Sequence, residues 1–139
     1  MTDHLDGILF MCVANSARSQ MAEAIARDMV AGRFPVYSAG SEPSQVNPFA
    51  TEALAEIGLS TDGHTSKGVE DVPMNRVRWL ITLCAEEVCP FVPGQVVRLH
   101  WPHPDPAGNG ENHTEILESF RSVRAALQQR IQRFLDAVN

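Results

Sequence analysis

Short β-favouring runs alternate with segments of helical periodicity along most of the chain. The β-favouring runs occupy residues 8–13, 34–38, 79–83 and 96–100. Apolar residues recur every three or four positions over about 17–31, 47–58 and 116–138. Strands that alternate with helices are joined by right-handed crossovers into a parallel sheet. We therefore predict an α/β fold with a four-stranded parallel sheet flanked by helices on both faces.

The size and charge of the chain narrow the possible functions. It has 139 residues, which indicates one domain spanning 1–139. Seventeen acidic residues outnumber eleven Lys and Arg residues, giving a net charge of −6. This balance argues against a nucleic-acid partner and a polybasic membrane patch. No apolar run exceeds seven residues, so no transmembrane helix is expected. Without an evident exposed apolar stripe, we also expect a monomer.

The beginning of the sequence and its cysteines indicate a compartment. The first four residues lack the cationic flank and the small-residue cleavage pattern of a secretory signal, so we expect a cytoplasmic protein. In that reducing compartment the three cysteines would be thiols rather than a structural disulfide framework.

The segment from Cys12 to Ser19 predicts an anion-binding loop. Cys12 stands at the end of the first predicted strand, and Arg18, after five intervening residues, opens a helix. Successive backbone N–H groups and the helix N-terminus can form a concave nest for a tetrahedral oxyanion, which the Arg18 guanidinium would close. The N–H groups of the nest would come from Val13, Ala14, Asn15, Ser16 and Ala17.

The same nest favours a nucleophilic Cys12. Positive partial charges around the sulfur stabilise a thiolate, and Ser19 could donate a hydrogen bond to it. Asn15 tolerates the left-handed backbone that a tight loop needs. The structural alternative is that Cys12 is a small buried hydrophobic residue.

Cys84 follows the third predicted strand directly, and Cys89 comes after four intervening residues. If the first and third strands are neighbours, Cys84 can approach Cys12. A second thiol can then expel a reduced ligand from Cys12, and a third can carry the disulfide outward. The alternative is a pair of incidental loop thiols. A zinc site has weak support, because no fourth ligand stands at a suitable spacing, although His100 and His103 are nearby.

Asp105 lies between two prolines after the fourth predicted strand, at the edge of the sheet where ligands bind in open α/β folds. There it could protonate a leaving oxygen. The alternative is that Asp105 only caps a turn. The histidines show no metal-like clustering beyond His100 and His103, so we expect no metal site.

The segments that carry a family resemblance are residues 12–23, 37–40, 46–48, 82–84, 89–90, and 100–101 together with 105–108. Together they resemble the low-molecular-weight protein tyrosine phosphatase fold in its thiol-relay arsenate reductase branch, over residues from about 7 to 135. Ordinary low-molecular-weight phosphatases lack the two relay cysteines. They usually carry an aromatic residue where this chain has Ala107.

The resemblance implies a mechanism. Arsenate binds in the loop under Arg18, Cys12 attacks arsenic, Ser19 stabilises the thiolate, and Asp105 protonates the departing hydroxyl. Cys84 then attacks Cys12 and releases arsenite. Cys89 then attacks Cys84, which converts the Cys12–Cys84 disulfide into a Cys84–Cys89 disulfide. This second disulfide is reduced by thioredoxin, or else by glutaredoxin or a low-molecular-weight thiol. No bound cofactor is implied.

The chain also departs from the family pattern. Ala14 and Ala17 replace residues that are often glycine and cysteine. Some members bind potassium through side chains that match Asn15, Glu23, Ser38 and an aspartate, but the aspartate position is Lys67 here. We predict that the Lys67 ammonium replaces the ion and pairs with Glu23 and Asn15.

Two other functions fit parts of the pattern. A phosphatase acting on phosphotyrosine or a small aryl phosphate would need Cys12, Arg18 and Asp105 but neither of the other cysteines. A non-enzymatic oxyanion-binding or redox-sensing module would use Cys12 oxidation to change the loop between Cys84 and Cys89.

Overall fold

A computed structural model describes residues 7–84, 96–108 and 110–138. The four strands are β1 (Gly7–Cys12), β2 (Val36–Gly40), β3 (Val77–Thr82) and β4 (Val97–His100). They form one parallel sheet in the order β2-β1-β3-β4. The α-helices are α1 (Arg18–Val30), α2 (Pro48–Ala55) and α3 (His113–Val138). The parallel sheet and the neighbouring positions of β1 and β3 are therefore confirmed.

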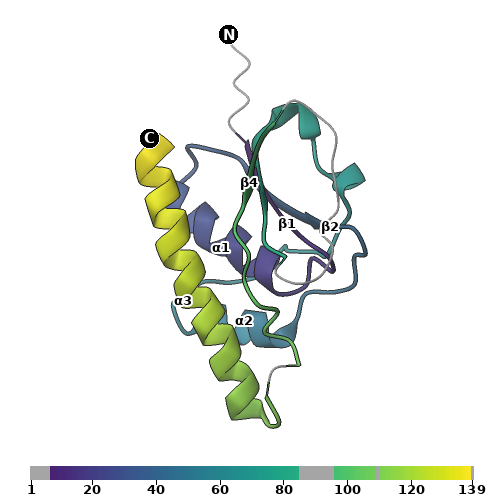
Figure 1. Ribbon diagram of the computed structural model, residues 1–139, viewed down its shortest axis with the longest axis vertical. Helices are drawn as coiled ribbons and strands as arrows, with labels where there is room; N and C mark the ends of the chain where they lie inside the picture. Colours follow the sequence, from purple (N-terminus) through teal and green to yellow (C-terminus); the bar gives the residue numbers. More distant parts are fainter. Residues whose placement is uncertain (1–6, 85–95, 109, 139) are drawn as a thin grey trace.

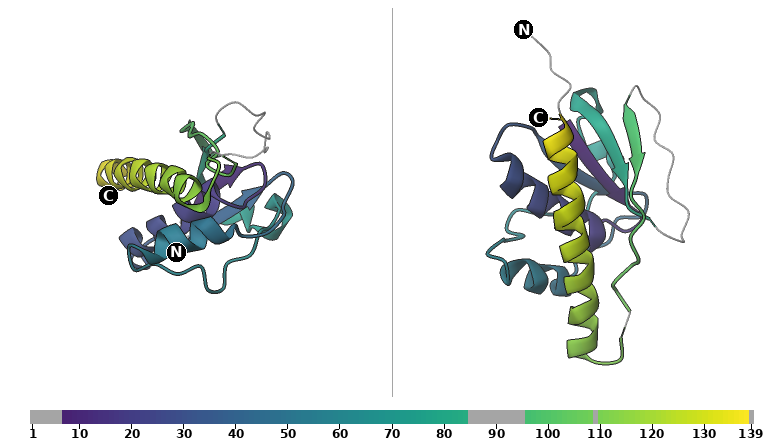
Figure 2. Two further views of the ribbon diagram at one scale, coloured as in Figure 1. Left: turned by 90° about the horizontal axis from the view of Figure 1, so that it is seen from below. Right: turned by 60° about the vertical axis from the view of Figure 1, so that its left-hand side comes forward.

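Helices lie on both faces of the sheet, but the two faces differ in the kind of helix. The three α-helices pack against one another on one face, with the long α3 running beside α1 and α2 (Figures 1 and 2). On this side Ile8 and Phe10 of β1 join the large core. On the other side Leu9 and Met11 join a smaller cluster with residues of two short 3-10 helices, η1 (Val69–Asp71) and η2 (Met74–Arg76), and their surroundings.

Local sequence signals explain where α2 begins, but they place the ends of α1 and α2 too late. Asn47 caps α2, because its side chain accepts a hydrogen bond from the N–H of Phe49, and Pro48 occupies the first turn. The first helix, which was predicted over about 17–31, covers a slightly shorter range. The helix stops at Val30, and Ala31 adopts the left-handed conformation with φ 51°. The second helix is also shorter than predicted, since it ends at Ala55 rather than near Gly58.

The second strand begins and ends later than its β-favouring run indicated. It covers Val36–Gly40, so the residues that were expected to close the strand belong to it. Gly40 pairs with Cys12 across β1 and β2. This register brings the carboxyl ends of β1 and of the edge strand β2 together, on the side of the sheet where the functional residues were predicted.

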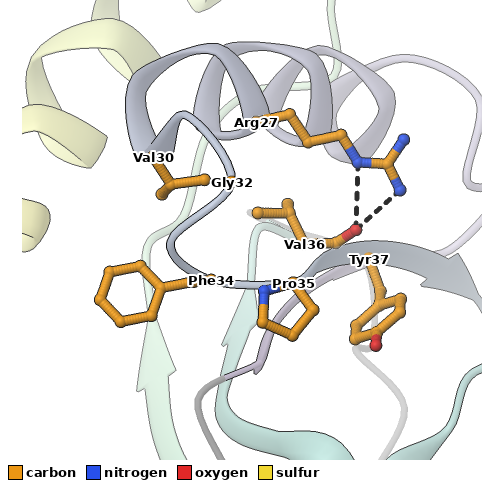
Figure 3. A pocket seen from close by; sticks show the side chains of 7 residues that line it. All are labelled: Arg27, Val30, Gly32, Phe34, Pro35, Val36 and Tyr37. Carbon is orange, nitrogen blue, oxygen red and sulfur yellow. Dashed lines mark hydrogen bonds between the residues drawn. The ribbon is translucent and has the colours of Figure 1, made fainter.

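A wide hollow lies at the opposite, amino-terminal end of β2 (Figure 3). Its volume is about 540 Å³, and it is lined by Arg27, Val30, Gly32, Phe34, Pro35, Val36 and Tyr37. The Arg27 guanidinium donates to the Val36 carbonyl oxygen from both Nε (3.3 Å) and Nη2 (2.8 Å). Arg27 also pairs with Glu23 at 2.8 Å. These contacts give Arg27 a structural role between α1 and β2.

Candidate active site

The loop between Cys12 and Arg18 is held by hydrogen bonds to its outward-facing carbonyl groups. The Val13 carbonyl accepts from the N–H of Glu42 (2.8 Å), and the Ser16 carbonyl accepts from the N–H of Asn47 (3.0 Å). Ser66 Oγ donates to the Ala14 carbonyl at 2.8 Å. In a trans peptide the N–H points opposite to the C=O. The following N–H groups therefore face the concave side of the loop, as an oxyanion nest requires.

Asn15 gives the loop its turn. Its backbone has φ 48°, the left-handed conformation that the sequence predicted. Its side-chain Oδ1 accepts hydrogen bonds from Gln20 Nε2 (3.1 Å) and from the N–H of Lys67 (2.9 Å). These two donors orient the amide, so that Asn15 Nδ2 donates to Ser19 Oγ at 2.8 Å.

The Ser19 hydroxyl lies 2.9 Å from Cys12 Sγ. Because the Ser19 oxygen already accepts from Asn15, its own proton is available for the sulfur. Cys12 and Ser19 are both buried, at 2% and 0% exposure. The structure thus brings together the predicted nucleophile and the predicted hydroxyl donor, in the geometry that stabilises a thiolate.

Gln20 and His64 extend this network, and the sequence analysis missed both. Gln20 Nε2 donates to the Asn15 and Thr65 carbonyl groups (3.1 and 3.0 Å) in addition to Asn15 Oδ1. His64 Nδ1 lies 2.9 Å from Gln20 Oε1. An amide oxygen only accepts, so Nδ1 carries the proton. Burial lowers the pKa of His64. The available signal was Gln20 on the buried face of the helix, but its partner lies 44 residues away.

The predicted partners of the Lys67 ammonium are wrong. Lys67 Nζ donates to the backbone carbonyl groups of Thr65 (2.9 Å) and Ser38 (3.4 Å). Glu23 instead accepts from Ser38 Oγ and pairs with Arg27. Lys67 does contact Asn15, but through its backbone N–H. Two carbonyl oxygens lie within hydrogen-bond distance of the Lys67 ammonium, and the Glu23 carboxylate is already paired with the Arg27 guanidinium. These two contacts explain the arrangement.

Arg18 begins α1 and is 4% exposed. Its Nη1 donates to the carbonyl groups of His103 (3.0 Å) and Leu83 (3.5 Å), which follow β4 and β3. The guanidinium is therefore fixed between the ends of two strands. A planar group held in this way is suited to bind an oxyanion.

Three of the predicted catalytic residues, Cys12, Arg18 and Asp105, line one small cavity. Its volume is about 100 Å³, and it is lined by Cys12, Ala14, Ser16, Ala17, Arg18, Asp105 and Ala107. Asp105 also caps a turn, since its Oδ1 accepts from the N–H of Ala107 at 3.0 Å. The catalytic and the turn-capping interpretations of Asp105 are therefore compatible. Thiol, guanidinium and carboxyl group can act on one bound tetrahedral anion in this cavity.

Cys84 lies at the carboxyl end of β3, next to β1. Met11 pairs with Thr82, and the N–H of Leu83 donates to the Met11 carbonyl at 2.9 Å, so the two strands run side by side up to the thiols. Cys84 is 1% exposed and is disulfide-bonded in this structure, which differs from the prediction that all three cysteines are thiols, whereas Cys12 has the predicted free thiol. Cys89 lies outside the described residues.

The sequence matches a family model that covers almost the whole chain. The model describes low molecular weight phosphotyrosine protein phosphatases and matches residues 7–139. The chain belongs to this family.

The three relatives that follow are all named arsenate reductases. Arsenate reductase 2 of Staphylococcus saprophyticus is 38% identical over 131 residues, which cover 93% of this chain and 95% of that protein. A solved arsenate reductase in the phosphate binding state is 31% identical with a TM-score of 0.82, covering 96% of this chain and 99% of that chain. A thioredoxin-dependent arsenate reductase of Corynebacterium glutamicum is 28% identical with a TM-score of 0.66, covering 95% and 64%.

Other features of this family member are mainly structural. Within residues 7–84, 96–108 and 110–138, no three His, Cys, Asp or Glu side chains group as metal ligands would. His100 Nδ1 lies 2.7 Å from Thr82 Oγ1, and this hydrogen bond joins β4 to β3. Among the helices of the described chain, none has the length and apolar character of a membrane span.

Proposed function

We propose that this protein reduces arsenate to arsenite through a relay of three thiols. The observation that carries the proposal is the cavity of about 100 Å³ that Cys12, Arg18 and Asp105 share, with Cys84 at the end of the adjacent strand. A phosphatase needs the first three groups. The additional cysteine just after the adjacent strand, and relatives that are named arsenate reductases, favour reduction.

In the first step Arg18 and the backbone N–H groups of the loop bind the arsenate oxygens. The Cys12 thiolate attacks arsenic, and an oxygen leaves as water after Asp105 donates a proton. A Cys12–arsenic(V) adduct results. Ser19 and Asn15 contribute by holding the thiolate toward the cavity. The small volume of the cavity suits a tetrahedral oxyanion better than a bulky ester.

In the second step Cys84, whose disulfide a dithiol carrier has reduced beforehand, attacks Cys12 Sγ as a thiolate. The sulfur–arsenic electron pair goes to arsenic, which leaves as arsenite reduced by two electrons, and the two thiols are oxidised to a disulfide. Cys89 then attacks Cys84, which restores the Cys12 thiol. The final Cys84–Cys89 disulfide is reduced by an external dithiol, for which we propose thioredoxin because a family member is thioredoxin-dependent.

This chemistry also indicates the cellular compartment in which the protein works. A relay that must be recharged by a dithiol carrier requires a reducing compartment, so we propose a cytoplasmic enzyme. We further propose that residues 1–139 work as one domain and as a monomer. No bound cofactor takes part, because the electrons come from the carrier.

The function is tested by arsenate-dependent NADPH consumption with thioredoxin and thioredoxin reductase. Sustained turnover is expected from the unmodified protein. Cys89→Ser should stop after about one turnover, because the Cys12–Cys84 disulfide cannot be passed on. Cys12→Ser should remove all activity. No turnover with thioredoxin, glutaredoxin or a low-molecular-weight thiol would overturn the proposal.

Phosphatase activity is a second candidate, because Cys12, Arg18 and Asp105 line one cavity and the family includes phosphatases. Cys84→Ser separates the two functions. It should abolish arsenate turnover and leave hydrolysis of an aryl phosphate unchanged. If the unmodified protein hydrolyses the aryl phosphate but never reduces arsenate, phosphatase is the correct function.

A further inference from the structure

The segment after β4 has an unusual distribution of hydrogen-bond donors. Residues 102, 104 and 106 are prolines, which have no backbone N–H. Trp101 and His103 use their N–H groups on the end of β3, since Trp101 donates to the Thr82 carbonyl (2.8 Å) and His103 donates to the Leu83 carbonyl (3.1 Å). The segment therefore continues the path of β4 beside β3, up to the cavity.

The imidazole of His103 fixes the same segment from inside. His103 is 6% exposed, and its Nδ1 lies 2.8 Å from the Trp101 carbonyl oxygen. A carbonyl only accepts, so Nδ1 carries a proton. Burial lowers the pKa of His103, and the positive charges of Arg130 on α3 and Arg18 on α1 act in the same direction. The neutral ring with its proton on Nδ1 is thus the stable form.

The carbonyl group of His103 contacts the anion-binding arginine. Arg18 Nη1 donates to it at 3.0 Å and more weakly to the Leu83 carbonyl at 3.5 Å. The position of the guanidinium in the cavity consequently depends on where the His103 peptide lies. Two hydrogen bonds restrain the residue that carries this carbonyl group: the His103 N–H bond to Leu83 and the imidazole bond to Trp101.

Trp101 is itself firmly placed. Its ring packs against Phe134 of α3 with centroids 5.7 Å apart, and the Arg130 guanidinium lies over it at 5.3 Å. The His103 imidazole is therefore anchored to a carbonyl that α3 holds in place. Trp101, Arg130 and Phe134 do not themselves line the cavity.

We propose that His103 is a positioning residue for oxyanion binding: its Nδ1–H bond to Trp101 holds the carbonyl group that places Arg18. The inference rests on the proposed function, because it assumes that Arg18 binds the anion. It adds a residue that touches neither the anion nor Cys12 and acts through the arginine.

Two polar variants test the geometry. In His103→Asn the amide nitrogen stands where Nδ1 was and can reach the Trp101 carbonyl. In His103→Gln the amide nitrogen lies one bond farther, where Nε2 was. Phosphate binding is measured by titration calorimetry and melting temperature by calorimetric scan, because neither depends on arsenate turnover. Both variants are also made together with Arg18→Lys.

His103→Gln should weaken phosphate binding about fivefold to tenfold, since a buried hydrogen bond of about 1 kcal/mol is lost. His103→Asn should stay within about twofold of the unmodified protein. With Arg18→Lys, the two variants should differ by less than about twofold, because coupled residues are not additive. The arsenate assay should show a raised KM for His103→Gln with a smaller change in kcat.

Equal phosphate affinity of the two variants would overturn the inference. It would also be overturned if His103→Gln weakened phosphate binding as much in the Arg18→Lys background as in the unmodified protein. A loss that only follows the melting temperature would also overturn it. If the unmodified protein does not bind phosphate, the inference fails with the anion site. If the effect of the His103 variants on phosphate affinity depends on Arg18 as expected but arsenate is not reduced, the inference stands and the proposed function fails.

Discussion

Gly40 is the residue whose substitution tests the architecture of the site most directly. It ends β2 opposite Cys12. A Cβ atom at this position would lie 2.4 Å from the Val13 carbonyl oxygen and 2.8 Å from the Asn15 nitrogen. Carbon–oxygen contacts of this kind normally need about 3.3 Å. In Gly40→Ala the backbone of the anion loop must therefore move by about 0.9 Å, because both obstructing atoms are backbone atoms.

A displacement of that size should lower kcat/KM for arsenate about a hundredfold, since misplacement by about 1 Å costs a factor of this order. The assay is thioredoxin-coupled NADPH consumption, with phosphate affinity measured in parallel. Gly58→Ala is the matched control. Gly58 has φ 78° with no atom within 4 Å of its Cβ position. This control should lose about 1–2 kcal/mol of stability with kcat/KM nearly unchanged.

The two variants separate a local clash from a general loss of stability. If Gly40→Ala keeps kcat/KM and phosphate affinity within about threefold of the unmodified protein, the loop yields at little cost and the steric argument is refuted. If Gly58→Ala loses as much activity as Gly40→Ala, the effect is global instability.

Three further perturbations address separate contacts. Ser19→Ala removes the hydroxyl 2.9 Å from Cys12 Sγ and should slow iodoacetamide alkylation of Cys12 about tenfold at pH 6.5, measured by peptide mass spectrometry. Hydrogen bonds from Arg121 lower the pKa of Glu56 to about 2. The stabilisation is present above about pH 4.5 and lost as the pH falls toward 2, so urea unfolding midpoints of Glu56→Gln should depend less on pH in that range. Lys67→Met frees two carbonyl oxygens and should create a potassium stimulation of turnover; equal responses of parent and variant would contradict this.

The sequence predicted the parts of the site that depend on neighbours along the chain. Asn15 was recognisable because few non-glycine residues accept φ 48°, and Ser19 follows Cys12 closely enough for one loop to place both. The parallel sheet followed from the alternation of strands and helices. In each case the physical cause lies within about ten residues or in a general rule of chain topology.

Contacts between distant segments were beyond prediction. Gln20 has partners 5, 44 and 45 residues away, and nothing near it in the chain identifies His64 as one of them. The partners of the Lys67 ammonium are backbone carbonyl groups, which every residue has. Ala31, which is exposed, takes the left-handed conformation at the end of the first helix, although glycine is the usual residue there and Gly32 follows it.

The shape of the anion loop depends on hydrogen bonds to residues much farther along the chain, which are synthesised later. Asn15 depends on Lys67, 52 residues away, and Arg18 depends on His103, 85 residues away. Contacts of such sequence separation form late, because closing long loops costs entropy before any contact compensates for it. A nascent chain that has emerged only to β2 thus carries Cys12 without its oxyanion nest. The reactivity of the thiol and its selectivity for oxyanions therefore both depend on contacts with residues as far along the chain as His103.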